Sequence, residues 1–343
     1  MSVQITDCTI RDGGYLFNKN SDPEFVKGVM KGLAEAGIDF VETGFLQINV
    51  TGETLVYADS VDARKYLPED KGYTNFLGFC DNSRYSLEEL DDYDGKSFKW
   101  LRISFAQHEI DEAIKFCKGA QEKGYIVQFN PMDSISYTDK AREDLINKVN
   151  MVKPGSFSIV DTFGAMDMLD LVHIFKQVDS ILDKDIKIGL HSHDNLALSC
   201  ALAERMIELA EESGRDVIVD GSLFGMGRGA GNAKTELLAD YINKHCGGNY
   251  DLQKLLLTID TYITPVLGEI HWGYDLPMYV CGTKHAHVDN VYHLSEKFGC
   301  TANEIYDLVE MLSPQQRIRY GKGYSKVDFS ALDEAYEKYH VIK

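Results

Sequence analysis

Short apolar runs rich in β-branched and aromatic residues return about every 25–30 residues along most of this chain, and this rhythm constrains the fold most strongly. Stretches with helical periodicity separate the runs. Eight such units over about 245 residues are typical of a (β/α)₈ barrel, although a doubly wound open sheet is the competing architecture. The predicted strands are Val3–Ile10, Ile38–Phe45, Asn75–Cys80, Trp100–Phe105, Ile126–Pro131, Phe157–Thr162, Ile186–His193 and Val217–Leu223.

The placement of polar residues favours the barrel. Active sites in that fold lie at the carboxyl ends of the strands. Polar or flexible residues fall at or just past these ends: Asp12, Glu42, Asp161, His193 and Gly225. We therefore expect a single site in the mouth of the barrel.

After about residue 245 the alternation stops and helical patterns dominate. The helices expected there are Asp251–Thr261, Val288–Phe298, Ala302–Leu312 and Phe329–His340. Thr301 and Glu304 form a capping box at the start of the third. We divide the chain into a barrel at residues 1–245 and a helical region at residues 246–343, which would serve as a lid or as an oligomer interface.

Composition narrows the class of partner. The net charge of −19 argues against nucleic acid and anionic membrane surfaces, which require a basic face. No apolar run is long enough for a membrane span, and the first residues lack the pattern of a signal peptide. The seven cysteines are scattered along the chain and odd in number, which indicates reduced thiols and argues against a disulfide framework. We expect a cytoplasmic protein that acts on a small molecule.

His191 and His193 end an apolar run and are followed by Asp194 and Asn195. Residues at i and i+2 on a strand point to the same face. Two imidazoles with one carboxylate are a common ligand set for a divalent metal. The alternative is structural, with both rings paired to neighbours and Asp194 capping the next helix.

Arg11 and Asp12 precede Gly13 and Gly14 at the end of the first predicted strand. In isolation this pattern would be a surface ion pair and a turn. In a closed barrel the first strand adjoins the eighth and lies near the seventh, so Asp12 could reach a metal held by the histidines. Arg11 would then supply a fixed cation for a carboxylate or an enolate oxygen.

A glycine-rich segment, Gly225–Asn232, follows the last predicted strand. It resembles a dinucleotide fingerprint only superficially, because more helix follows where a second strand and an acidic residue should lie. We interpret the glycines as allowing the backbone to approach the site, with Asn232 offering an oxygen to the metal.

Aromatic and histidine residues cluster between His271 and His287 in a stretch without clear periodicity. The cluster either packs the helical region on the barrel or reaches the active site. The sequence leaves both interpretations open.

Together these motifs resemble the DRE-TIM metallolyases, also called the HMG-CoA lyase-like superfamily. The shared patterns are Asp7-x-Thr9-Ile10-Arg11-Asp12-Gly13, His191-x-His193-Asp194-Asn195 and the glycine-rich segment that ends at Asn232. Within this superfamily the chain looks most similar to the 4-hydroxy-2-oxovalerate aldolases. The resemblance implies Mn²⁺ or Mg²⁺ held by Asp12, His191 and His193, with Asn232 as a further ligand, and a 2-oxo acid chelated by the metal.

The resemblance further implies class II aldolase chemistry, in which a 4-hydroxy-2-oxo acid gives pyruvate and an aldehyde through a metal-stabilised enolate. Arg11 would stabilise that enolate. The substrate-binding residues we expect are Arg11, Arg102, Asp161 and Thr162. Some aldolases of this kind associate with an aldehyde dehydrogenase, and both that partner and a homo-oligomer remain open.

Two positions depart from the family. The aldolases carry a histidine, and the synthases a glutamine, where this chain has Tyr15. The general base is therefore open among Tyr15, Tyr279, His285 and His287. The glycine-rich loop has no cysteine of the kind found in the hydroxymethylglutaryl-CoA lyases, which argues against that branch.

The main alternative is a Claisen-type acyltransferase of the isopropylmalate or citramalate synthase kind, which condenses acetyl-CoA with a 2-oxo acid at a similar metal site. A biotin-dependent carboxyltransferase fits less well, because the fifth predicted strand ends without a lysine. An iron oxygenase and a zinc amidohydrolase do not match this fold or this strand order. A catalytically silent regulator built on the same scaffold is a further alternative.

Overall fold

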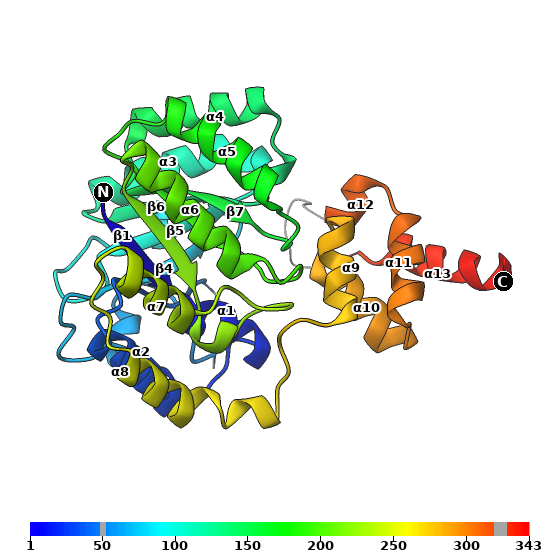
Figure 1. The fold of residues 1–343 in the computed structure, drawn as a ribbon, viewed down its shortest axis with the longest axis horizontal. Helices are drawn as coiled ribbons and strands as arrows, with labels where there is room; N and C mark the ends of the chain where they lie inside the picture. Colours follow the sequence, from blue (N-terminus) through cyan, green and yellow to red (C-terminus); the bar gives the residue numbers. More distant parts are fainter. Residues whose placement is uncertain (49–52, 319–327, 343) are drawn as a thin grey trace.

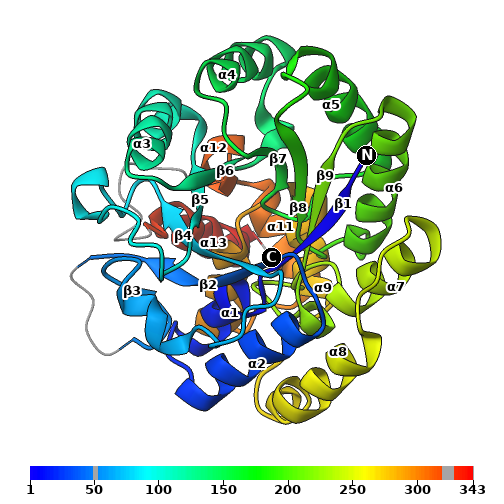
Figure 2. The same ribbon diagram turned by 90° about the vertical axis from the view of Figure 1, so that its left-hand side faces the viewer.

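The computed structural model describes residues 1–48, 53–318 and 328–342, and within them a closed parallel barrel forms the larger part of the molecule (Figures 1 and 2). Neighbouring strands follow the order β1-β9-β8-β7-β6-β5-β4-β2, and pairing of Thr6 with Phe40 closes the ring between β1 and β2. The strands are β1 (Val3–Asp7), β2 (Phe40–Leu46), β4 (Asn75–Asp81), β5 (Trp100–Phe105), β6 (Ile126–Pro131), β7 (Ser156–Asp161), β8 (Lys187–Ser192) and β9 (Val217–Gly221), with a short β3 (Val56–Tyr57) beside β2. The predicted barrel is confirmed and the open sheet is excluded.

Helices surround this barrel on its outer face (Figure 2). They are α2 (Pro23–Glu35), α3 (Ile110–Glu122), α4 (Asp139–Val152), α5 (Met168–Ile181), α6 (Ser199–Ser213), α7 (Thr235–His245) and α8 (Leu252–Thr258). Asp22 caps the start of α2, since its carboxylate accepts a hydrogen bond from the Glu24 N–H at 2.9 Å. Between β2 and β5 the described connections contain short 3₁₀ turns in place of long helices.

The first strand ends earlier than predicted, and a helix takes the place of its last residues. The run Val3–Ile10 was expected to be a strand throughout, but β1 ends at Asp7 and Thr9–Asp12 form the short helix α1. The Asp7 carboxylate accepts a hydrogen bond from the Thr9 N–H at 2.9 Å, and the Thr9 hydroxyl accepts one from Leu223 N–H at 2.8 Å. These polar contacts turn the chain out of the sheet, so Arg11 and Asp12 lie on α1 above the barrel.

The interior of the barrel is layered. Phe40, Leu77, Ile218 and Trp100 pack together near the amino ends of their strands. Beyond them Arg102 of β5 reaches Asp220 of β9 across the lumen, because these strands are not neighbours in the sheet. A layer of charged side chains thus lies between this apolar layer and the carboxyl ends of the strands.

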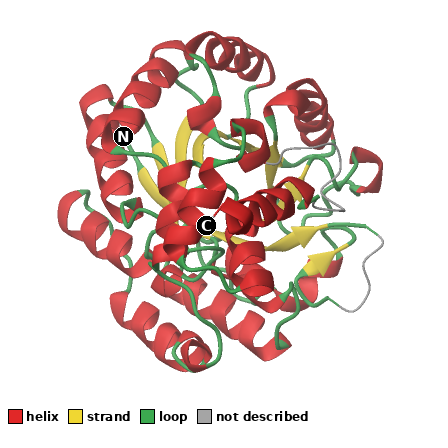
Figure 3. Cartoon of the chain, turned by 90° about the vertical axis from the view of Figure 1, so that its right-hand side faces the viewer, coloured by secondary structure: helices red, strands yellow, loops and turns green. Residues whose placement is uncertain are grey.

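The remaining helices stand against the carboxyl-end face of the barrel (Figures 1 and 3). They are α9 (Leu276–Lys284), α10 (Val288–Phe298), α11 (Ala302–Glu310), α12 (Pro314–Ile318) and α13 (Ser330–Ile342). Helix α9 lies inside the stretch that the sequence presented as irregular. No helix among the described residues is long and apolar enough to cross a membrane.

The chain continues to pack against the barrel beyond the predicted boundary at residue 245. Leu255, Ile259, Ile263 and Trp272 belong to the hydrophobic core of the barrel, whereas Met278 starts a separate core shared by the last helices. Helix α8 and the segment after it therefore belong with the barrel in terms of packing.

Candidate active site and metal centre

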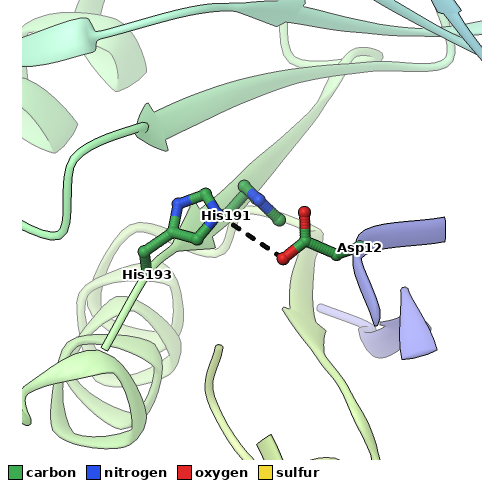
Figure 4. A group of neighbouring side chains, drawn as sticks. All are labelled: Asp12, His191 and His193. Atoms are coloured by element: carbon green, nitrogen blue, oxygen red, sulfur yellow. Dashed lines mark ion pairs between the residues drawn. The ribbon is translucent and has the colours of Figure 1, made fainter. Parts of the chain in front are cut away.

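Three potential metal ligands converge above the carboxyl end of β8 (Figure 4). His191 lies on β8, His193 directly follows it, and Asp12 ends α1. One ligand atom from each lies within 4.8 Å of those from the other two, and His193 Nε2 is 3.5 Å from Asp12 Oδ2. The structure therefore brings together the residues that the two sequence motifs suggested, although they are far apart in the chain.

Hydrogen bonds orient both imidazoles. His191 Nδ1 is 2.9 Å from the Asp220 carboxylate, and His193 Nδ1 is 3.1 Å from the carbonyl oxygen of Asp161. Each ring can therefore direct Nε2 towards the cluster, which is the usual arrangement around a metal-binding histidine. Sequence reasoning missed Asp220. Its only signal was one carboxylate at an inward position of an apolar strand.

The donor set fits a divalent cation. Besides two imidazoles and a carboxylate, the buried Asn232 Oδ1 has no hydrogen-bond partner among the described residues. The Nδ2 of the same side chain donates to Asp12 Oδ2 at 2.7 Å, so the amide is fixed beside the cluster. Buried polar atoms seldom lack a partner, and an oxygen ligand suits Mn²⁺ or Mg²⁺.

The charge states of Asp12 and His191 suit metal binding, whereas His193 would have to give up a proton to a bound cation. Burial lowers the pKa of His191, against the opposing effect of Asp220, and so favours a neutral imidazole. Burial also opposes ionisation of Asp12, yet the charges of Arg11 and His193 hold the pKa of Asp12 well below its usual range. Likewise, burial disfavours a charged His193, but contact with Asp12 raises its pKa.

Arg11 is a buried, fixed cation beside the cluster. Its Nη1 donates to Asp12 Oδ1 at 2.6 Å and its Nε to Glu42 Oε2 at 2.7 Å. Its Cζ lies 4.6 Å from the centroid of the Phe79 ring. These contacts leave the guanidinium little freedom, so its positive charge is preorganised beside the cavity.

Arg102 extends the network below the cluster. It donates to Gln128 Oε1 at 2.7 and 3.0 Å and also binds the Asp220 carboxylate. Asp220 in turn contacts His191, so polar contacts connect Arg102 on β5, Asp220 on β9 and His191 on β8. Burial opposes ionisation of Asp220, but Arg102 lowers its pKa and keeps it a carboxylate.

A cavity opens above these residues and is walled on its outer side by the C-terminal helices. Most of the predicted site residues contribute to it, and so do residues that were not predicted, among them Phe79, Arg228 and Val288. The lining residues are Arg11, Asp12, Tyr15, Phe79, Arg102, Ser104, Asn130, Met132, Val160, Thr162, Phe163, His191, His193, Arg228, His287 and Val288.

Besides Asn232, three residues that the sequence suggested for substrate binding or catalysis lie outside that lining. The Asp161 carboxylate accepts hydrogen bonds from the N–H groups of Ala165 and Met166, and burial raises its pKa to about 6. Tyr279 lies on α9 with 41% of its surface exposed. His285 pairs with Asp133 at 2.6 Å. Their roles in substrate binding or catalysis stay predictions.

Residues 99–261 match the family described as HMGL-like. The chain is similar to 4-hydroxy-2-oxovalerate aldolase from Geobacillus thermodenitrificans, with 26% identity over 284 residues that cover 77% of each protein. It is also similar to oxaloacetate decarboxylase from Mycobacterium tuberculosis, with 26% identity and 68% of each protein covered.

Solved structures extend the likeness. The N-terminal domain of a candidate aldolase from Bacteroides vulgatus is 28% identical, with a TM-score of 0.71 over 88% of this chain and 98% of that one. The HMG-CoA lyase from Brucella melitensis is 15% identical, with a TM-score of 0.63 over 78% of this chain and 99% of that one. At this identity the lyase shares the fold, and the fold alone. The superfamily resemblance drawn from the motifs is confirmed by these matches.

Proposed function

Because residues 99–261 match the HMGL-like family, we propose that this chain is a metal-dependent class II aldolase. It would cleave a 4-hydroxy-2-oxo acid into pyruvate and an aldehyde. The names of several relatives support this activity. The observation that carries the proposal is the cluster of Asp12, His191 and His193 beside the fixed Arg11 in one cavity.

Asp12, His191 and His193 would hold a divalent cation, with Asn232 as the fourth protein ligand. When bound, the cation supplies Lewis-acid polarisation of the 2-oxo group. Relatives differ in whether they are named aldolase or decarboxylase, and both reactions leave the same three-carbon enolate.

Arg11 would stabilise the charge that forms during cleavage. The C3–C4 bond breaks, its electron pair moves towards the 2-oxo oxygen, and the 4-hydroxyl carbon becomes the aldehyde carbonyl. Nε and Nη1 of Arg11 are held by Glu42 and Asp12, and the residue lines the cavity, so its charge is in place without reorganisation. Protonation at C3 then completes pyruvate.

Tyr15 is the residue we assign to the proton of the 4-hydroxyl group. His287 Nδ1 accepts a hydrogen bond from the Asp289 N–H at 3.2 Å, so a neutral His287 carries its proton on Nε2 and is a donor there. Burial raises the pKa of Tyr15, against the opposing charges of Arg11 and Arg228, so its phenol is neutral. Tyr15 would therefore accept the substrate proton while its own phenolic proton passes to water, and the proton taken up later at C3 balances the one lost from the 4-hydroxyl group.

The test is pyruvate release from 4-hydroxy-2-oxo acids, coupled to lactate dehydrogenase and NADH, with and without Mn²⁺. We expect manganese-dependent pyruvate from the wild type and none from His191→Ala. His173→Ala is the matched control, because His173 lies exposed on α5 and should leave activity intact.

A different result would redirect the assignment. If no chain length gives pyruvate while the protein still binds manganese, the aldolase proposal is wrong. Release of free thiol from acetyl-CoA with a 2-oxo acid would then identify the acyltransferase alternative.

A further inference from the structure

Arg228 connects the metal-ligand cluster to the outer wall of the cavity. Its main-chain N–H donates to Asp12 Oδ2 at 3.2 Å, so its backbone lies at the cluster. Its side chain leads away from there to the Asp289 carboxylate on α10, and its Cζ lies 5.4 Å from the centroid of the Tyr15 ring. The guanidinium is therefore separated from the metal ligands by the length of an arginine side chain.

The loop around Arg228 is fixed in this position. A Cβ on Gly227 would lie 2.2 Å from Asn232 Nδ2 and 2.5 Å from Asp12 Oδ2, so only glycine allows this approach. Gly229 has a φ of +66°, which favours glycine as well. Met226 packs against Gly13 in the interior. Arg228 is thus the loop's charged side chain, and it lines the cavity.

Arg228 has donors beyond those that Asp289 can accept. A guanidinium carries five N–H groups in a planar fork, and a single carboxylate accepts at most two of them in a bidentate pair. His287 lines the same wall, and its Nδ1 accepts from the Asp289 N–H. The outer wall therefore presents the Arg228 cation to the cavity.

We propose that Arg228 binds an anionic group at the distal end of the substrate. This inference rests on the proposed aldolase function and specifies its substrate class, a 4-hydroxy-2-oxo acid whose aldehyde half carries a carboxylate or a phosphate. With the 2-oxo acid end at Asp12, His191 and His193, an anion at Arg228 falls on C5 or beyond, past the bond that breaks. The aldehyde product is then itself an anion.

A purely structural role for Arg228 makes a different prediction. If the ion pair with Asp289 only fastens α10 to the glycine-rich loop, loss of either partner should affect charged and uncharged substrates alike. Recognition of an anion requires the cation and not its carboxylate partner. Arg228→Gln and Asp289→Asn therefore separate the two roles.

The first test is binding, which does not depend on turnover. Manganese-loaded protein is titrated calorimetrically with 2-oxoglutarate, with 2-oxohexanoate, which lacks the distal charge, and with a 2-oxo acid of similar length that ends in a phosphonate. We expect the wild type to bind a distal anion about 10- to 100-fold more tightly than 2-oxohexanoate. The tighter of the two anionic probes identifies the distal group.

Variants of Arg228 and Asp289 test whether the preference for an anionic ligand comes from the Arg228 charge. Arg228→Gln should abolish the preference and leave affinity for 2-oxohexanoate within about twofold. Arg228→Lys should keep part of the preference, and Asp289→Asn should keep most of it. Equal affinities in the wild type, or equal weakening of both ligands in Arg228→Gln, would overturn the proposal.

Cleavage assays keep the two proposals apart. Pyruvate release is compared for 4-hydroxy-2-oxoglutarate and 4-hydroxy-2-oxohexanoate. Equal kcat/KM for both compounds, with equal binding, would refute the anion subsite and leave the aldolase standing. Absence of pyruvate from both, with the binding preference intact, would refute the aldolase and leave the anion subsite standing. Failure of all probes to bind in the presence of manganese would refute both.

Discussion

The Asp220 carboxylate contacts two side chains in the barrel interior, Arg102 and His191. It accepts from Arg102 on one side and contacts His191 Nδ1 at 2.9 Å on the other. A carboxylate in this position fixes the ring orientation and raises the basicity of the opposite nitrogen. Asp220 is therefore a positioning residue for the proposed metal ligand.

Asp220→Asn should weaken Mn²⁺ binding by about 10- to 100-fold, because the amide keeps the shape but not the charge beside His191. The measurement is a calorimetric or electron paramagnetic resonance titration of the protein with Mn²⁺. Asp216→Asn is the control, because Asp216 is half exposed near the amino end of β9 and pairs with the N-terminus. Equal Mn²⁺ affinity in Asp220→Asn and wild type would contradict the role given to Asp220.

Tyr15 and Tyr279 are two phenols that the sequence did not distinguish. Tyr15 lines the cavity beneath Arg228, whereas Tyr279 lies on the exposed face of α9. Tyr15→Phe should lower kcat for pyruvate release by about 100-fold with little change in KM, because proton transfer is lost while the ring remains. Tyr279→Phe should change neither parameter. A loss confined to Tyr279→Phe would reverse the assignment.

The residues at the centre of the site were predictable for different reasons. His191 and His193 stand out because a strand puts i and i+2 on one face, so a local pattern already specifies a shared direction. Asp220 offers no such pattern. One carboxylate in an apolar strand does not reveal which side chain on another strand it meets, and this depends on register across the barrel.

Two short elements show where local patterns were misread. Helix α1 was read as strand because Ile10 continues the apolar run, although the side chains of Asp7 and Thr9 capture backbone N–H groups. Helix α9 had a readable start, since the Asp275 carboxylate accepts from Met278 N–H at 2.7 Å and Pro277 lies in the first turn. Its aromatic neighbours concealed the pattern.

Two glycines on α2 allow this helix to approach α8 and the segment Ile259–Ile263 that follows it. A Cβ on Gly32 would lie 2.0 Å from Thr258 Oγ1, and one on Gly28 would lie 2.0 Å from the Tyr262 ring. Alanine is normally the better helix former by about 1 kcal/mol. Here the steric conflict outweighs this preference, so an alanine at Gly32 should lower the free energy of unfolding. Thr258 is buried and cannot move away freely.

Gly32→Ala should therefore reduce the free energy of unfolding by about 1–3 kcal/mol, opposite to its effect on an isolated helix. Urea unfolding followed by circular dichroism measures this change. In a double-mutant cycle, Thr258→Ala should recover much of the loss, because it removes the atoms nearest to the new methyl group. Stabilisation by Gly32→Ala, or simple additivity in the cycle, would show that the helices do not meet as closely as described.

The assembled molecule places its cations where its overall charge would not suggest them. The chain carries a net charge of −19, yet Arg11, Arg102 and Arg228 all line the cavity. Each is held by carboxylates from distant segments. Composition argues against polyanionic partners but does not report a local cationic site, because only the fold brings these residues together.

The C-terminal helices are joined to the mouth of the barrel by an apolar contact and by two ion pairs. Ala230 of the glycine-rich loop packs in the same core as Met278 and Val288. Arg228 pairs with Asp289, and His285 pairs with Asp133 on the opposite loop. Both pairs cross from the barrel to the helices that cover its cavity, so they bear on the stability of the closed arrangement.

The His285–Asp133 pair should make that stability depend on pH. Burial opposes a charged His285, but its hydrogen bond to Asp133 raises the pKa of the imidazole above its usual value. A group whose pKa is raised on folding binds its proton more tightly in the folded state, so its contribution is complete below the unfolded pKa of about 6.5 and is lost as the pH rises through the folded pKa.

His285→Gln should therefore destabilise the protein by about 1 kcal/mol near pH 6 and by clearly less near pH 8.5. The difference in thermal unfolding midpoint between variant and wild type is measured at each pH. Asp133→Asn should reproduce the trend, because it removes the other partner. His285 has a φ of +50°, and the difference in backbone strain between histidine and glutamine does not depend on pH, so the change with pH isolates the charge. A difference that stays constant with pH would mean that His285 contributes packing alone, and that the closure of these helices over the cavity is insensitive to its protonation.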